Sequence, residues 1–234
     1  MLAIIVPIFN EEEIICNFLS DWETILKKSN IKYVFYLVND CSTDFTKLRI
    51  YQYTQKRKNF ILIDLKKNVG HGKSCLIGFK AALKNQHNWY LQIDSDGQCH
   101  PKHLNSFLRC MRKDLEFVIA DRVVRFDGYI RSFISRILSL VILLLTGIYV
   151  RDANTPYRLI NIKALDSIFF DKKYNKISLT NVYQTYFFIK NLPKDKVKWI
   201  DINFYDRKFG HSKISYKKMF KQLMDLIINL SFKN

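Results

Sequence analysis

The feature that most constrains the fold is a regular alternation of apolar runs with amphipathic stretches in the first half of the chain. The apolar runs have the length and composition of buried strands, and the stretches between them have helical spacing. Strand followed by helix, four times over, predicts an α/β fold with a doubly wound, mostly parallel sheet and helices on both faces. The predicted strands are Ala3–Ile8, Tyr33–Val38, Phe60–Leu65, Trp89–Ile93 and Phe117–Ala120, and the predicted helices are Glu11–Lys28, Thr43–Lys56, Lys73–Lys84 and Pro101–Arg112.

Beyond Asp121 the alternation ends, and a basic segment leads into an uncharged run of 14 residues between Arg136 and Arg151. As a helix this run would span roughly 21 Å, short of the ~30 Å hydrocarbon core of a bilayer, so we do not expect it to cross a membrane. Either a core helix or a helix lying on a membrane surface fits Phe133–Val150. Later expected elements are helices near Lys163–Phe170 and Thr180–Ile189, a strand over Val197–Tyr205 and an amphipathic helix with a basic start over Ser215–Phe232.

Composition excludes several classes of protein. Of the 234 residues 48% are hydrophobic, so the chain can bury a core and is not disordered. The five cysteines are scattered without a C-x-x-C pair, and no signal peptide opens the chain, which together indicate a reducing, cytoplasmic compartment. The net charge of +17 lies mostly in the second half, which holds 21 basic and 9 acidic residues. A nucleic-acid-binding protein is a distant alternative on charge alone, since no nucleic-acid motif is present.

Polar clusters follow four of the predicted strands, at the ends where ligands bind in such sheets. The last cluster contains Asp94, Asp96 and Gln98 within one turn. Their hard oxygen atoms suit Mg²⁺ or Mn²⁺ bridging a diphosphate, whose developing charge a divalent cation neutralises. Acidic capping of the next helix is the alternative for the two aspartates.

Two other clusters allow more than one interpretation. Asp40 could accept hydrogen bonds from a base or ribose, or it could cap the helix that Ser42 and Thr43 open. The segment Gly72-Lys73-Ser74 is not a P-loop, because position 67 is Lys, and it is not a dinucleotide fingerprint, because position 75 is Cys. It remains a glycine-rich loop whose Lys73 enters a helix, where it is a candidate for a donor phosphate or part of a simple turn.

In this order, the motifs resemble those of the family 2 glycosyltransferases of the GT-A fold. Within that family the chain looks most like the polyprenyl-phosphate type, typified by dolichol-phosphate mannosyltransferase. The resemblance covers essentially the whole chain. It is carried by VPIFNEEE at 6–13, VNDCSTDFT at 38–46, NVGHGKSCLIGFKAA at 68–82 and DSDGQCHP at 94–101, and by looser matches at Arg122, Arg131-x-x-x-Ser135, DANTPYR at 152–158 and Arg207-x-x-Gly210-x-Ser212-Lys213.

The resemblance implies a single GT-A domain over residues 1–213, with a nucleotide-sugar half (1–117) and an acceptor half (118–213), followed by an amphipathic helix over 214–234. It also implies roles for individual residues. Asp94, Asp96 and Gln98 would hold the metal and the diphosphate, with Asp96 counted as catalytic. The nucleotide pocket would be lined by Pro7, Phe9, Glu11 and Asp40, the donor phosphate would meet Arg207, Ser212 and Lys213, and the acceptor phosphate would meet Arg122, Arg131 and Ser135.

The expected reaction is an inverting transfer from a nucleotide-sugar to a polyprenyl phosphate, by an enzyme peripheral on the anionic inner face of the cell membrane and without a nucleic-acid partner. The sequence departs from the family pattern at two positions that bear on this expectation. Cys41 stands where Gly is usual and would restrict its turn, and Pro156-Tyr157-Arg158 replaces the commoner Gly-Phe-Arg. The second departure supports an alternative acceptor, a saccharide hydroxyl in cell-surface polysaccharide synthesis. That acceptor needs a general base, for which Asp152 is the candidate unless it only caps a loop. No Glu in Thr180–Ile189 matches the one seen in mannosyl-transferring relatives, so mannose is not assigned.

Overall fold

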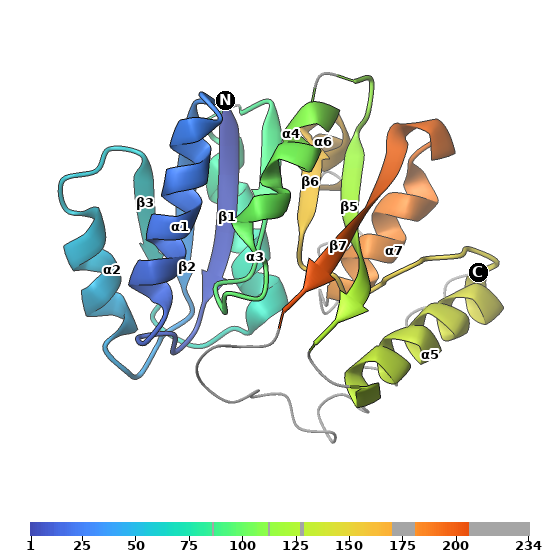
Figure 1. Ribbon diagram of the computed structural model, residues 1–234, viewed down its shortest axis with the longest axis horizontal. Coiled ribbons are helices and arrows are strands. Elements are labelled where there is room, and N and C mark those ends of the chain that lie inside the picture. Colours follow the sequence, from blue (N-terminus) through green and yellow to red (C-terminus); the bar gives the residue numbers. More distant parts are fainter. Residues whose placement is uncertain (86, 112, 127–128, 170–180, 206–234) are drawn as a thin grey trace.

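The computed structural model describes residues 1–85, 87–111, 113–126, 129–169 and 181–205, and these build a seven-stranded mixed sheet with helices on both faces (Figure 1). The strand order is β3-β2-β1-β4-β6-β5-β7. Every neighbouring pair is parallel except those made by β6, which runs antiparallel to both β4 and β5. The predicted α/β fold is confirmed. The strands are β1 Leu2–Ile8, β2 Tyr33–Asn39, β3 Phe60–Asp64, β4 Trp89–Gln92, β5 Phe117–Arg125, β6 Arg158–Asn161 and β7 Val197–Phe204.

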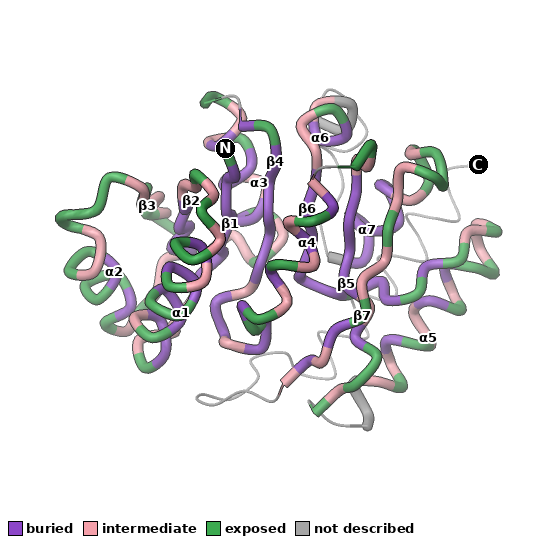
Figure 2. Tube along the Cα trace, turned by 45° about the horizontal axis from the view of Figure 1, so that its top comes forward, coloured by how far each residue is buried: buried purple, intermediate pink, exposed green. Residues whose placement is uncertain are grey.

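The apolar character of β1 explains the two-sided sheet, because all seven of its residues are buried. Side chains alternate along a strand. Ile4 and Val6 therefore join the core beneath α1 (Ile15–Lys28), α2 (Thr46–Thr54) and α4 (Leu104–Cys110). Ala3 and Ile5 face the other core, beneath α3 (His71–Leu83), α6 (Ile162–Phe169) and α7 (Asn181–Asn191). The tube in Figure 2 shows the buried strands running between these two layers.

Helix α3 lies especially close to the sheet at Gly78. A Cβ atom at that position would lie 2.7 Å from Ile5 Cγ2 and 3.1 Å from Val38 Cγ2, closer than side chains pack in protein cores. A glycine is therefore required where α3 crosses β1 and β2. This close approach fixes the first turn of α3 beside the carboxyl ends of these strands, where the candidate site lies.

Several predicted boundaries were wrong for local reasons. The helix predicted from Glu11 begins at Ile15, because residues 9–14 form a loop tied to the next strand end. The helix predicted from Pro101 divides into the 3₁₀ turn η1 (Pro101–His103) and α4, and a second 3₁₀ turn, η3 (Lys194–Lys196), precedes β7. The short antiparallel strand β6 was not predicted at all. It is four residues long and starts with Arg158, which is fully buried.

Helix α5 (Tyr129–Thr146) occupies most of the uncharged run and lies beside the edge of the sheet formed by β5 and β7 (Figure 1). It ends at Gly147, whose positive φ of 69° and N–H bond to the Leu143 carbonyl form a common helix stop. Ile142 packs into the core, whereas Phe133, Leu140 and Leu144 are exposed by 64%, 53% and 75%. The helix is thus only partly a core helix. Across the described residues, no helix has the length and apolar character needed to cross a membrane.

Candidate active site

The loops after β1 and β2 are joined by short hydrogen bonds at the carboxyl edge of the sheet. The Asn10 N–H donates to Ser42 Oγ at 2.9 Å, and the Glu11 N–H donates to Thr46 Oγ1 at 2.7 Å. A further bond of 2.7 Å runs from the Phe45 N–H to a Glu12 carboxylate oxygen. These bonds satisfy backbone groups that the strands leave unpaired. Glu11 and the half-buried Phe9, both predicted to line the nucleotide pocket, therefore sit on a loop with a fixed conformation.

Asp40 is buried at the end of β2 and holds the loop that precedes α3. Its carboxylate accepts hydrogen bonds from the N–H groups of Val69 at 2.7 Å and Gly70 at 2.9 Å. The alternative that Asp40 caps the helix opened by Ser42 and Thr43 was wrong, because the N–H of Thr46 at the start of α2 is bound by Asp44. Asp40 as a nucleotide contact stays a prediction. Gly70 has a φ of 87°, so the loop needs a glycine there.

Cys41, directly after Asp40, adopts the left-handed conformation with a φ of 58°. A side chain in this region is strained by contact between Cβ and the backbone. The expectation that a residue other than glycine restricts this turn therefore has a structural basis, since the turn retains the conformation that glycine adopts most easily.

The three predicted metal ligands all follow β4, although each is held differently. Asp94 Oδ1 lies 2.7 Å from His71 Nε2, at the first residue of α3. Asp96 is 7% exposed and accepts the Gln98 N–H at 3.1 Å. The Gln98 side chain donates through Nε2 to the carbonyl of Tyr205 at 2.9 Å. Ser95, between the two aspartates, donates to the Pro7 carbonyl at 3.1 Å, so this loop is also attached to the end of β1.

The chemistry of this donor set fits a hard divalent cation. Two carboxylates and one amide oxygen occur within five residues of one loop, and such oxygen ligands suit Mg²⁺ and Mn²⁺. No group of three or more His, Cys, Asp or Glu side chains gathers in the part of the chain that the structure describes. The two carboxylates and one amide of this loop would fill only part of the coordination sphere of such a cation, and Mg²⁺ sites are commonly completed by phosphate oxygens and water. Lys73 is exposed on the first turn of α3.

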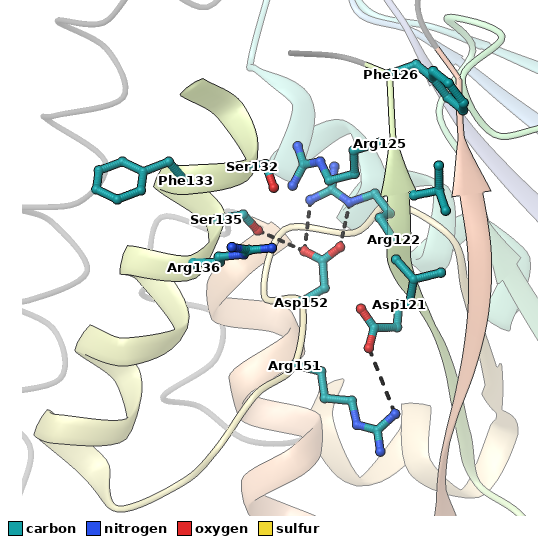
Figure 3. A pocket seen from close by; sticks show the side chains of 12 residues that line it. Asp121, Arg122, Arg125, Phe126, Ser132, Phe133, Ser135, Arg136, Arg151 and Asp152 are labelled. Atoms are coloured by element: carbon teal, nitrogen blue, oxygen red, sulfur yellow. Dashed lines mark hydrogen bonds and ion pairs between the residues drawn. The ribbon is translucent and has the colours of Figure 1, made fainter. Parts of the chain in front are cut away.

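An open cleft of about 1080 Å³ lies between the end of β5, the first half of α5 and the segment at Arg151–Asp152 (Figure 3). Its lining combines four arginines with two aspartates and several apolar side chains. The lining residues are Asp121, Arg122, Val123, Val124, Arg125, Phe126, Ser132, Phe133, Ser135, Arg136, Arg151 and Asp152.

At the base of this cleft, Arg122 and Asp152 form a buried ion pair. Arg122 Nε lies 2.5 Å from Asp152 Oδ2 and Nη2 lies 2.8 Å from Oδ1, while Ser135 Oγ donates to the same Oδ1 at 3.1 Å. Burial alone would raise the pKa of Asp152, but the Arg122 guanidinium outweighs burial and lowers the pKa below its usual value. The fold thus brings two predicted acceptor ligands to the predicted base Asp152. Arg122 lies 30 residues before Asp152 in the chain, and Ser135 lies 17 residues before it.

Arg136 and Arg151, which also line the cleft, are more exposed than Arg122. Arg151 Nη1 is 3.9 Å from Asp121 Oδ2 and is half exposed. Arg136 is exposed, and Figure 3 shows it extending from α5 toward Asp152. The apolar wall beside them is solvent-exposed, with Val124 at 44% and Phe126 at 56%. The sequence favoured a functional role for Arg136 as part of the basic segment, without assigning it a ligand, and gave no role to Arg151 or Phe126. The only signal for these two residues was their position, at the end of the uncharged run and directly after β5.

The residues Pro156-Tyr157-Arg158, which differ from the commoner family pattern, do not line this cleft. The Tyr157 ring stacks on Phe107 with centroids 4.3 Å apart and also contacts Trp22. Arg158 begins β6 and donates through Nη1 to Gln184 Oε1 at 2.9 Å. Both side chains belong to the core, so this substitution affects packing rather than the cleft. The Arg131 side chain, Arg207, Ser212, Lys213 and the helix expected over 214–234 lie outside the described residues.

The sequence comparison decides the family. A sequence model of glycosyl transferase family 2 matches residues 3–178. The chain belongs to glycosyl transferase family 2. As a family 2 glycosyltransferase it is an enzyme, and the resemblance seen in its strand-end motifs is confirmed.

Curated relatives extend the match over nearly the whole chain. An undecaprenyl-phosphate 4-deoxy-4-formamido-L-arabinose transferase from Photorhabdus laumondii is 25% identical over 98% of this chain and 68% of its own length. An uncharacterized protein from Methanocaldococcus jannaschii is 33% identical over 74% of this chain and 77% of its own length. The chain therefore spans about two thirds of the length of the first of these relatives.

A solved structure shows the same fold. The crystal structure of glucosyl-3-phosphoglycerate synthase from Mycobacterium tuberculosis, in complex with Mn²⁺, UDP-glucose and glycerol 3-phosphate, superposes with a TM-score of 0.73. It covers 98% of this family 2 glycosyltransferase and 80% of its own chain, with 13% sequence identity. Identity this low establishes the shared α/β architecture and nothing about the substrate.

Proposed function

We propose that this glycosyltransferase moves a sugar from a nucleotide-sugar, bound with Mg²⁺ or Mn²⁺, to a polyprenyl phosphate at the cytoplasmic surface of the cell membrane. The observation that carries the proposal is the lining of the cleft beside α5. Arginines and exposed apolar side chains share one concave surface there, and a ligand that satisfies both must have an anionic head and an apolar tail.

On the donor side, the proposal rests on Asp94, Asp96 and Gln98, whose oxygen atoms would hold the metal. A bound divalent cation would neutralise charge that develops on the leaving diphosphate. The glucosyl-3-phosphoglycerate synthase named above binds Mn²⁺ and UDP-glucose on the same fold. Asp40 and Glu11 lie on loops fixed to each other and to α3, so they can orient a nucleoside without rearranging.

On the acceptor side, Arg125, Arg136 and Arg151 supply positive charge around the Arg122–Asp152 pair, and Val124, Phe126 and Phe133 supply the apolar wall. Guanidinium groups form strong charge-assisted hydrogen bonds with phosphate. The Photorhabdus relative is named for an undecaprenyl-phosphate acceptor, which has this combination of phosphate and apolar chain.

The expected chemistry is a direct displacement at the anomeric carbon. An acceptor phosphate oxygen forms the new bond to that carbon as the bond to the diphosphate oxygen breaks, and the electron pair leaves with the nucleoside diphosphate. A phosphate acceptor is already an anion, so no strong general base is needed. Asp152, paired with Arg122 and Ser135, would then orient these groups. Its role as a base belongs to the alternative with a saccharide acceptor.

Association with the membrane is part of the proposal and rests on α5. Phe133, Leu140 and Leu144 are exposed on a helix that also carries Arg136, and the same helix lines the cleft. A helix with exposed apolar side chains and basic residues binds at the interface of an anionic bilayer. Docked there, α5 would bring the mouth of the cleft to the depth of lipid headgroups.

The test is a labelled-donor assay with two acceptors, a short-chain polyprenyl phosphate and a lipid-linked saccharide, across a panel of nucleotide-sugars with Mn²⁺. We expect product with the polyprenyl phosphate. The variant Arg136→Gln should raise the KM for the polyprenyl phosphate about 10-fold or more and leave the KM for the donor unchanged. The reason is that a hydrogen bond to a charged group contributes about 1.5–3 kcal/mol.

Arg109→Gln is the matched control, because Arg109 is exposed on α4 and its loss removes the same charge away from the cleft. Product with the saccharide alone would show that the alternative acceptor is correct. An equal change in acceptor KM for both variants would remove the cleft from the proposal.

A further inference from the structure

Tyr205, the residue directly after β7, is held on several sides by the two candidate ligand sites. Its ring stacks on Phe126 with centroids 5.8 Å apart and planes 7° from parallel. On the donor side, the centroids of the Tyr205 and His100 rings are 5.7 Å apart. Lys102 Nζ lies 4.6 Å from the centre of the Tyr205 ring and donates a hydrogen bond to the Tyr205 hydroxyl. Phe126 lines the cleft, whereas His100 and Lys102 follow the metal loop.

The backbone carbonyl of Tyr205 also accepts the hydrogen bond from Gln98 Nε2 at 2.9 Å, and Gln98 is only 4% exposed. A carbonyl oxygen can accept but never donate, so the amide must present its NH₂ group to Tyr205. Its Oε1 is therefore turned away from Tyr205. Reversing the amide would place two oxygen atoms against each other at hydrogen-bond distance, which is unfavourable in a buried site.

We propose that Tyr205 is a positioning residue that fixes the Gln98 amide with its oxygen available to the metal. This inference rests on the proposed function, because it takes Gln98 to be a metal ligand. Tyr205 does not touch the metal in this account. Its ring contacts hold the end of β7 in place, and the carbonyl at that position sets the orientation of the ligand side chain. Such outer partners of metal ligands commonly control affinity.

The inference gives an unusual sign for one substitution. Gln98→Glu adds a negative charge to a cation site and would ordinarily tighten metal binding. Here the new carboxylate has no N–H to offer the Tyr205 carbonyl, and one of its oxygens faces that carbonyl instead. We expect Gln98→Glu to weaken metal binding and to raise the half-saturating Mn²⁺ concentration roughly 10-fold or more.

The measurement is thermal stabilisation by a nucleoside diphosphate as Mn²⁺ is titrated, since a ligand that binds the native state raises apparent stability. UDP, GDP, CDP and dTDP are tried on the wild type, and the one that stabilises it is used throughout. Tyr205→Leu, which loses the ring and hydroxyl contacts, should also raise the half-saturating Mn²⁺ roughly 10-fold. Tyr205→Phe keeps the stack on Phe126 and should stay within about threefold, because an exposed polar contact contributes little.

Tyr33→Leu is the matched control. It removes an edge-to-face ring contact with Phe35 at the opposite end of the sheet, so it should lower the melting temperature without moving the half-saturating Mn²⁺. In metal-free protein, amide hydrogen exchange over residues 94–103 should quicken in Tyr205→Leu but not in Tyr33→Leu.

The inference is overturned if Gln98→Glu lowers the half-saturating Mn²⁺ concentration. It is also overturned if Tyr205→Leu and Tyr33→Leu change that concentration equally. A wild type that no nucleoside diphosphate stabilises with Mn²⁺ would instead refute the proposed function, and this inference with it.

Discussion

The buried pair of Arg122 and Asp152 gives the sharpest test of how the proposed acceptor cleft works. The two side chains are 5% and 6% exposed, and Asp152 accepts two bonds from Arg122, one from Ser135 and one from the N–H of Asn154 at 3.2 Å. Asp152→Asn keeps the shape but removes the charge, and so leaves a buried guanidinium without its counter-ion. Breaking a buried pair in this way costs about 3–5 kcal/mol.

For a chain of this size, each kcal/mol lowers the melting temperature by about 2–4 °C, so Asp152→Asn should lower it by about 6–20 °C. The assay is thermal and urea unfolding of wild type, Asp152→Asn, Arg122→Met and the double variant. Because the two side chains touch, the double variant should be less destabilised than the sum of the single variants by about 0.5–3 kcal/mol.

The dependence on pH has a definite sign. Arg122 lowers the pKa of Asp152 in the folded state below its value in the unfolded chain. The stabilisation is therefore complete above the unfolded pKa and is lost only as the pH falls through the folded pKa. The difference between wild type and Asp152→Asn should stay constant from pH 8 to pH 5. If Asp152→Asn loses all transfer activity yet unfolds within about 0.5 kcal/mol of wild type, the orienting role is wrong and a general base becomes the better account.

Other predictions concern strain, acidity and the membrane. Cys41→Gly should raise the free energy of unfolding by about 0.5–1 kcal/mol in urea, because it relieves a left-handed φ; no gain would mean that the turn is not strained. Burial lowers the pKa of His87, whose Nε2 bonds to the Tyr36 hydroxyl, so stability should fall as the pH drops below about 6.5. His87→Gln should flatten that dependence, and an unchanged slope would point to another group. Leu144→Glu should reduce co-flotation with anionic vesicles at least about 10-fold. Leu48→Glu on α2, at a site 49% exposed, should leave flotation unchanged, and equal effects would argue against docking through α5.

The fold could be predicted where local sequence determines it. The apolar runs that became β1, β2 and β4 are long enough to show continuous burial, and the helix after each is amphipathic. Strand β6 gave no such signal, because four residues are too few to show a period and the first of them is a buried arginine. Arg158 is tolerated there because Gln184, 26 residues later, accepts its hydrogen bond, a contact that only the tertiary structure supplies.

The site followed the same rule. Asp94, Asp96 and Gln98 can be predicted as metal ligands because their spacing along one loop is itself the signal. Their partners could not be predicted, since His71 and Tyr205 lie 23 and 107 residues away from the residues they hold. The pairing of Arg122 with Asp152 was missed for this reason, although both residues were candidates. A sequence can identify the residue types that a reaction needs, whereas their orientation depends on contacts across the sheet.

These contacts suggest why the two halves of the site are built differently. The donor-side carboxylates Asp40 and Asp94 are already bound by groups of the chain, so little orientation is left to arrange when a nucleotide-sugar binds. On the acceptor side, Asp152 is committed to Arg122, and the cleft keeps a positive excess from its other arginines. A fixed donor site beside a positively charged, partly apolar cleft favours an acceptor that brings its own negative charge and needs no deprotonation. Under the proposed function, the basic second half of the chain would meet the phosphate of the acceptor.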